Sequence, residues 1–142
     1  MAENDVFIEA PPERVFAVLA EPARYPEWVV GAREVRAAEE RFPEPGASFA
    51  WEGGAGPFTL SDETTVVESE PPRRLVLEVR VSRLGTARIE LTLEREAAGT
   101  RVTMVEAAER GAVLRAANAV ADGILSLRND RALERLKRLA EA

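Results

Sequence analysis

The chain has 142 residues, of which 46% are hydrophobic and 31% charged, which is typical of one globular domain with a substantial core. Its formal net charge of −6 disfavours nucleic-acid binding, because contacts to phosphates need a basic surface. With no cysteine and no histidine, the sequence excludes thiol catalysis, disulfides, Cys/His zinc sites and a Ser-His relay. We therefore expect a single domain over 1–142 that uses no metal and no other cofactor.

The start of the chain, Met1 to Asp5, is acidic and lacks the basic-then-apolar pattern of a signal peptide. No apolar run approaches the roughly 20 residues that a membrane-spanning helix needs. The sequence therefore predicts a cytoplasmic protein without a membrane span. It leaves open whether the chain forms a homodimer.

The N-terminal segment predicts a strand followed by a helix. Apolar and polar residues alternate over 5–9, as in a strand with one buried face. The Pro11-Pro12 pair cannot continue a central strand, but proline suits a first helical turn, so a helix is expected over 12–20. Two further prolines break 21–28 into a short helical turn and a loop.

Alternation of apolar and polar residues then predicts six strands, over 33–41, 47–52, 58–70, 75–82, 87–94 and 101–107. The glycine-rich stretch 53–57 is interpreted as a hairpin turn, because a phosphate-binding loop would need a helix after it. The charged residues Arg88, Glu90 and Glu94 are interpreted as the solvated face of the sheet, with cross-strand pairs.

The last segment, 113–141, contains no proline and is rich in good helix formers, which predicts one long helix. Its apolar stripe consists of Leu114, Ala117, Ala121, Leu125, Ala132, Leu136 and Leu139. Consecutive strands with short turns form an antiparallel meander, and this helix is the only element long enough to cover it. The expected fold class is therefore α+β.

Five segments of the chain together resemble a known family. They are Ile8 to Phe16 (IEAPPERVF), Tyr25 to Trp28 (YPEW), Val66 to Leu75 (VVESEPPRRL), Gly99 to Thr103 (GTRVT) and Leu133 to Lys137 (LERLK). In this order they are similar to the START-like (SRPBCC) superfamily, in its polyketide cyclase/dehydrase and lipid transport branch. The resemblance implies a helix-grip fold, in which a curved seven-stranded antiparallel sheet grips the C-terminal helix with a cavity between them.

The candidate wall of such a cavity comes from the inward-facing strand residues and the small residues of the last helix. It comprises Phe58, Leu60, Leu77, Val79, Ile89, Leu91, Met104, Ala121 and Leu125, with Trp51 near the mouth. The small alanines around Asn118 would leave space for a ligand, so Asn118 is the candidate polar contact. Asn129 follows it by three helical turns and lies on the same face.

Two groups have alternative interpretations. Asp62 shares a strand face with the candidate wall and is either a desolvated carboxylate near the cavity or, the preferred interpretation, a residue outside it or paired with an arginine. Tyr25 and Trp28 either touch a ligand at the rim or, more in line with their amphipathic rings, seal one end of the core.

The leading functional hypothesis is the binding of a small apolar or amphipathic molecule such as a lipid, a polyketide or a quinone-like compound. We assign no catalytic residue. An enzyme of the cyclase/dehydrase type is the alternative, and it needs only a shaped pocket and an acid–base group, for which Asp62, Glu106 and Tyr25 are candidates. A further alternative is a protein-interaction module that uses the outer face or an edge of the sheet.

Overall fold

The computed structural model describes residues 1–55, 57–81 and 84–142, apart from the side chains of 55, 58, 62, 112–122 and 124. The elements follow in the order β1 (Ala2–Ile8), α1 (Pro12–Leu19), η1 (Pro22–Arg24), α2 (Tyr25–Trp28), β2 (Ala32–Ala38), β3 (Ser48–Ala55), β4 (Phe58–Glu70), β5 (Arg74–Val81), β6 (Gly85–Glu96), β7 (Gly99–Arg110) and α3 (Ala112–Glu141).

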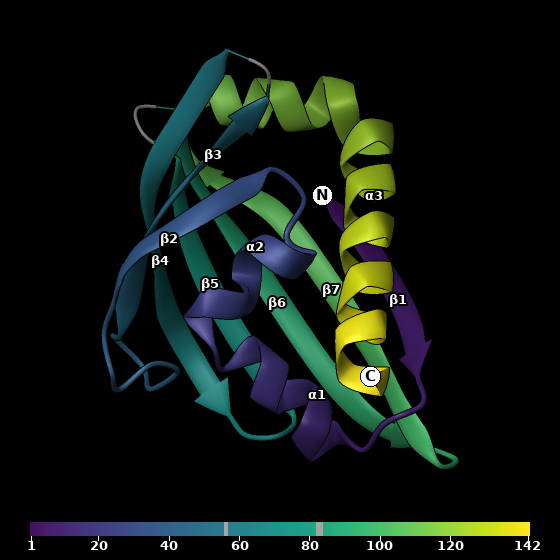
Figure 1. The fold of residues 1–142 in the computed structure, drawn as a ribbon. Helices are drawn as coiled ribbons and strands as arrows, with labels where there is room; N and C mark the ends of the chain where they lie inside the picture. The colour runs from purple at the N-terminus through teal and green to yellow at the C-terminus, as the bar shows by residue number, and fades with distance from the viewer. Residues whose placement is uncertain (56, 82–83) are drawn as a thin grey trace.

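The seven strands form one antiparallel sheet in the order β1-β7-β6-β5-β4-β3-β2. Strands β2 to β7 are a simple meander, and β1 adds to the β7 edge. The sheet curves around α1, α2 and the last part of α3 (Figure 1). The predicted α+β helix-grip architecture, with a seven-stranded sheet and a C-terminal helix, is confirmed.

The N-terminal strand–helix junction follows the predicted pattern. Pro12 occupies the first turn of α1, and Val15, Phe16 and Leu19 are buried on its inner face. The predicted helical turn is also present as η1 and α2. Both short helices lie on the concave side of the sheet (Figure 1), so they close one end of the space that the sheet encloses.

Strand β3 differs from the prediction because it continues through part of the glycine-rich stretch. Gly53 and Gly54 pair with Leu60 and Thr59 of β4, so the connection is shorter than expected. A Cβ atom at Gly53 would lie 2.3 Å from the carbonyl oxygen of Gly31. Glycine at this position therefore allows the loop before β2 to cross close to the β3 backbone. Gly56 of the predicted turn lies outside the described residues.

Helix α3 runs without interruption over Ala112–Glu141, as predicted, but its ribbon turns sharply between an early part (green) and a late part (yellow) in Figure 1. From Leu125 onward its described inner side chains are buried. Its C-terminal part is tied to β1: Asn4 Nδ2 donates to Asp130 at 2.8 Å and Lys137 Nζ to the Phe7 carbonyl at 3.1 Å. The docking of this late part is thus fixed by both packing and hydrogen bonds.

The outer face of the sheet carries charges in register, as predicted. Arg88 Nε donates to Glu90 at 3.1 Å, the Arg74 guanidinium lies 3.7 Å from the same carboxylate, and Glu94 is exposed. In the described part of the chain, no helix is both long enough and apolar enough to cross a membrane.

Candidate functional site

A cavity of about 640 Å³ lies between the concave face of the sheet and the helices. Ligand pockets in proteins typically have volumes of about 300–1,000 Å³. From the sheet, the described wall includes Leu60, Thr64, Leu77, Val79, Ile89 and Met104, and from α3 it includes Leu125, Arg128, Asn129 and Ala132. The segment Val29–Ala32 and Val35 of β2 complete it on the side of the sheet edge.

Central strands show where the sheet faces empty space. Val79 lies on β5 and Ile89 on β6, each with a hydrogen-bonded strand on both sides, and yet both side chains are only partly buried. Leu77 and Met104, also on the wall, are buried. Residual exposure of aliphatic side chains in the middle of a curved sheet is what a cavity beneath them produces.

Aromatic residues form one end of the cavity. Tyr25 and Trp28 of α2 and Phe49 of β3 line it, and the Tyr25 ring lies 4.9 Å from each of the other two ring centres. The Tyr25 hydroxyl donates to the Leu19 carbonyl at 2.8 Å, and burial raises the pKa of this hydroxyl well above its ordinary value. A hydroxyl held neutral in this way is a hydrogen-bonding group rather than a proton-transfer group near neutral pH.

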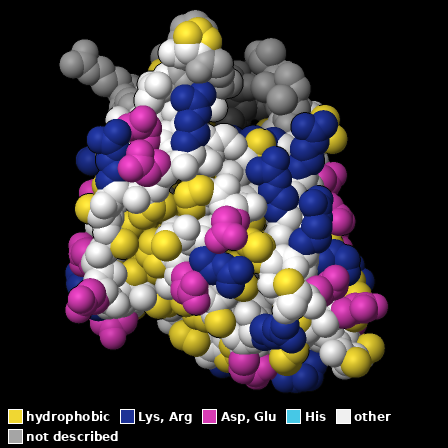
Figure 2. All heavy atoms as spheres, viewed as in Figure 1, with side chains coloured by type: hydrophobic (Ala, Val, Ile, Leu, Met, Phe, Trp, Pro, Cys, Tyr) yellow, Lys and Arg dark blue, Asp and Glu magenta, His cyan; other side chains and the backbone are white. Residues whose placement is uncertain are grey.

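The polar part of the wall is where β7 meets α3. Glu106 of β7 is only 8% exposed, and both of its carboxylate oxygens accept from Arg128 Nη2 at 3.0 Å. Arg128 extends to the surface, where it is partly solvated. The pair compensates the cost of burying the Glu106 charge, which would be several kcal/mol without a partner. On the face shown in Figure 2, basic side chains gather along the late part of α3.

Three residues on the wall carry N–H groups that are buried without a hydrogen-bond partner in the described part of the structure. They are Nε1 of Trp28, Nε1 of Trp51 and Nδ2 of Asn129. Unsatisfied buried polar groups are rare in folded proteins, because each costs about 1–3 kcal/mol. Within the described residues, no three His, Cys, Asp or Glu side chains gather where they could hold a metal ion.

The structure brings together many of the residues that the sequence suggested for the wall. The described wall contains Trp51, Leu60, Leu77, Val79, Ile89, Met104 and Leu125. Phe58, Asp62, Asn118 and Ala121 fall on side chains outside the described residues.

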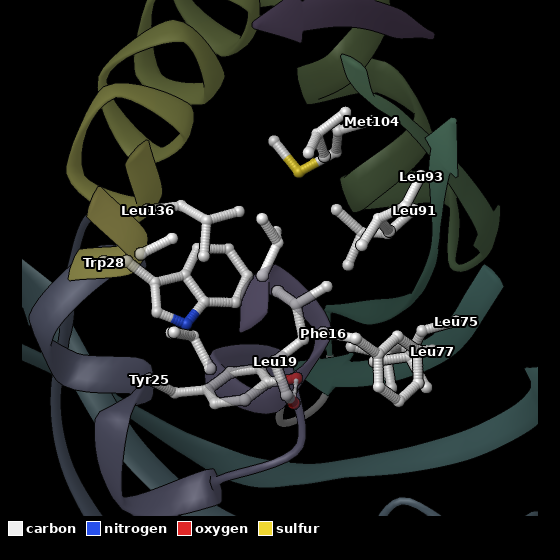
Figure 3. Packing of buried hydrophobic residues seen from close by; sticks show 14 of the residues in the cluster. Phe16, Leu19, Tyr25, Trp28, Leu75, Leu77, Leu91, Leu93, Met104 and Leu136 are labelled. Carbon is white, nitrogen blue, oxygen red and sulfur yellow. Dashed lines mark hydrogen bonds between the residues drawn. The ribbon is translucent and has the colours of Figure 1, made fainter. Parts of the chain in front are cut away.

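Leu91 is placed differently from the expectation. It is fully buried in the core cluster and is absent from the described wall. Leu91 follows Ile89 on the same face of β6, but nearer the end of the strand where α1 contacts the sheet. Figure 3 shows Leu91 beside Leu93, which is also buried. The cavity therefore occupies only one part of the concave face.

Tyr25 and Trp28 lie where the preferred interpretation, sealing one end of the core, places them, and they also line the cavity. Both are buried in the core cluster. Arg128 was missed because an arginine next to a helix stripe normally points to solvent. The spacing could have indicated its position. Arg128 and Asn129 follow Leu125 by three and four residues and so lie on the same helix face.

Comparison with solved structures shows the same fold over nearly the whole chain. A protein from Chromobacterium violaceum, CV1439, is 19% identical, with a TM-score of 0.76 over 99% of this chain and 96% of the other. A protein from Rhodobacter sphaeroides is 25% identical, with a TM-score of 0.75 over 96% and 89%. The di-domain ARO/CYC StfQ from the steffimycin biosynthetic pathway is 18% identical, with a TM-score of 0.74 over 98% of this chain and 49% of StfQ.

No curated protein matches the chain in sequence. A family model matches the chain over every element described above, from β1 to the end of α3. Because that model, for polyketide cyclase/dehydrase and lipid transport, matches residues 2–141, the chain belongs to this family.

Proposed function

We propose that the protein binds a small apolar or amphipathic molecule, of a lipid, polyketide or quinone-like kind, in the cavity between the sheet and α3. The observation that carries this proposal is the cavity of about 640 Å³ with a mainly aliphatic and aromatic wall. Removing apolar ligand surface from water is favourable by roughly 25 cal/mol per Å², so such a wall binds apolar molecules without any catalytic group.

Filling the cavity should reduce binding and leave the fold intact. The Ile89→Trp variant places an indole where the wall faces empty space. We expect it to unfold at nearly the wild-type denaturant concentration but to bind Nile red at least about tenfold more weakly. Probe fluorescence and urea unfolding followed by circular dichroism measure the two effects.

Leu91→Trp is the matched control, because it makes the same kind of enlargement two residues away on the same strand face. Leu91 is 0% exposed, so overpacking should destabilise the fold by about 1–3 kcal/mol. The proposal fails if the wild type takes up no probe. It also fails if Ile89→Trp loses as much stability as the control, because the space beneath Ile89 would then be filled.

A cyclase or dehydrase is the second candidate function, and the Glu106–Arg128 pair is the observation that favours it. A carboxylate on the wall of an apolar cavity can accept a proton from a bound substrate, and the neighbouring guanidinium can stabilise the negative charge that develops. The similarity in fold to the di-domain ARO/CYC StfQ also favours a cyclase. Conversion of a bound molecule that stops in Glu106→Gln, while binding persists, would favour the enzyme over the binding protein.

A further inference from the structure

The unpartnered polar groups of the cavity are all hydrogen-bond donors. An indole N–H can only donate, which applies to Trp28 and Trp51, and the unpartnered atom of Asn129 is its amide nitrogen. On the described wall, no side-chain acceptor is buried without a partner. The unpartnered buried side-chain groups of the described wall are therefore donors, and a bound molecule that supplies an acceptor would satisfy one of them.

Asn129 is the donor best placed to recognise such a molecule. It is 2% exposed, lines the cavity, and comes from α3 next to the Glu106–Arg128 pair, where the polar part of the wall lies. Burying an amide nitrogen without a partner is costly in an empty cavity. An oxygen of the ligand at this point would remove that cost and orient the molecule.

The charges next to Asn129 favour a neutral ligand oxygen. Arg128 is the cationic side chain of the described wall, and the Glu106 carboxylate already neutralises it. A carboxylate head group would bring a second negative charge next to Glu106 and would be repelled in this weakly solvated place. A ketone, ester, amide or quinone oxygen accepts a hydrogen bond without that repulsion.

We propose that the cavity selects a neutral ligand that carries a carbonyl oxygen, and that the Asn129 amide donates a hydrogen bond to this oxygen. The proposal rests on the ligand-binding function proposed above and names the chemical class that the cavity prefers. In this arrangement the apolar body of the ligand lies against the aliphatic and aromatic wall, and the carbonyl faces the junction of β7 and α3.

Three molecules of the same ring skeleton test this selectivity: 1-tetralone, tetralin and 1,2,3,4-tetrahydro-1-naphthoate. Each is titrated against wild-type protein loaded with Nile red, and dye release gives its affinity. We expect 1-tetralone to bind about three- to tenfold more tightly than tetralin, the gain of one hydrogen bond to a buried donor. The naphthoate should bind more weakly than tetralin.

Asn129→Leu should reduce the affinity for 1-tetralone to that for tetralin and leave tetralin binding unchanged. Asn129→Ala should likewise make the affinities for 1-tetralone and tetralin equal. It replaces the leucine variant if that variant folds poorly. The control is Thr100→Val, which removes a buried polar group that bonds the Ala10 carbonyl and is absent from the described wall. It should keep the wild-type preference for the ketone, even if it lowers stability.

The outcomes separate this inference from the proposed function. The inferred selectivity through Asn129 is wrong if the wild type binds 1-tetralone and tetralin equally well. It is also wrong if Asn129→Leu keeps the preference for the ketone. In both cases the proposed ligand-binding function stands. Preferential binding of the naphthoate would overturn the neutral-ligand inference in the same way. If the protein takes up neither the dye nor any of the three molecules, both the function and the inference fail.

Discussion

Replacing Leu136 with aspartate should abolish most of the protein's stability. Leu136 is 0% exposed, and Figure 3 shows it beside Trp28, at the contact between α3 and the short helix α2. An aspartate here would leave a charge without a partner in the core or force α3 away from the sheet. We expect a loss of about 4 kcal/mol or more, a large part of a typical domain's stability of about 5–15 kcal/mol.

Urea unfolding followed by circular dichroism measures this loss, and Leu127→Asp is its matched control. Leu127 lies on the same helix and is 56% exposed, so the same substitution should change the free energy of unfolding by less than about 0.5 kcal/mol. Equal effects at the two positions would contradict the docking of the late part of α3 against the core.

Alkaline pH should destabilise the protein through Tyr25, its only tyrosine. Burial raises the pKa of this hydroxyl in the folded protein, whereas in the unfolded chain it ionises near 10.0. Above that pH the unfolded chain binds fewer protons than the folded one, so stability falls as pH rises. The contribution of Tyr25 to the free energy of unfolding should decrease by about 1.4 kcal/mol for each pH unit above this value.

Ultraviolet absorbance of the phenolate, recorded together with urea unfolding, tests this dependence. Phenolate should appear only as the protein unfolds. Tyr25→Phe is the control, because it keeps Lys137, whose pKa is also raised, by its hydrogen bond with Glu141. The variant should have a shallower pH dependence and a stability about 1 kcal/mol lower at neutral pH. Phenolate formation in the folded protein would contradict the burial of Tyr25.

Local patterns in the sequence were sufficient to predict most of the fold. The alternation in β6 predicted a strand with one buried face, and the proline-free run of helix formers predicted α3. The Pro11-Pro12 pair predicted the start of α1. The extension of β3 could not be read in this way. Gly53 and Gly54 have no side chains to alternate, and they belong to β3 through their pairing with β4, where Gly53 also allows the close approach of Gly31.

The cavity was harder to predict than the fold, because it depends on what packs against the sheet. Ile89 and Leu91 look the same in the sequence, yet one borders the cavity and the other is fully buried. The Glu106–Arg128 pair joins two residues that lie 22 positions apart, on β7 and α3. Its formation depends on the position of α3 along β7, which no local pattern encodes.

Native mass spectrometry of the protein, purified gently from its own host, tests the ligand-binding account most directly. Ile89→Trp, prepared in the same way, is the comparison. The account predicts that the wild type carries a small molecule, that this molecule is apolar or amphipathic, and that the variant carries much less of it. Wild-type protein that shows only the mass of the chain, and that takes up no apolar probe afterwards, would contradict the account.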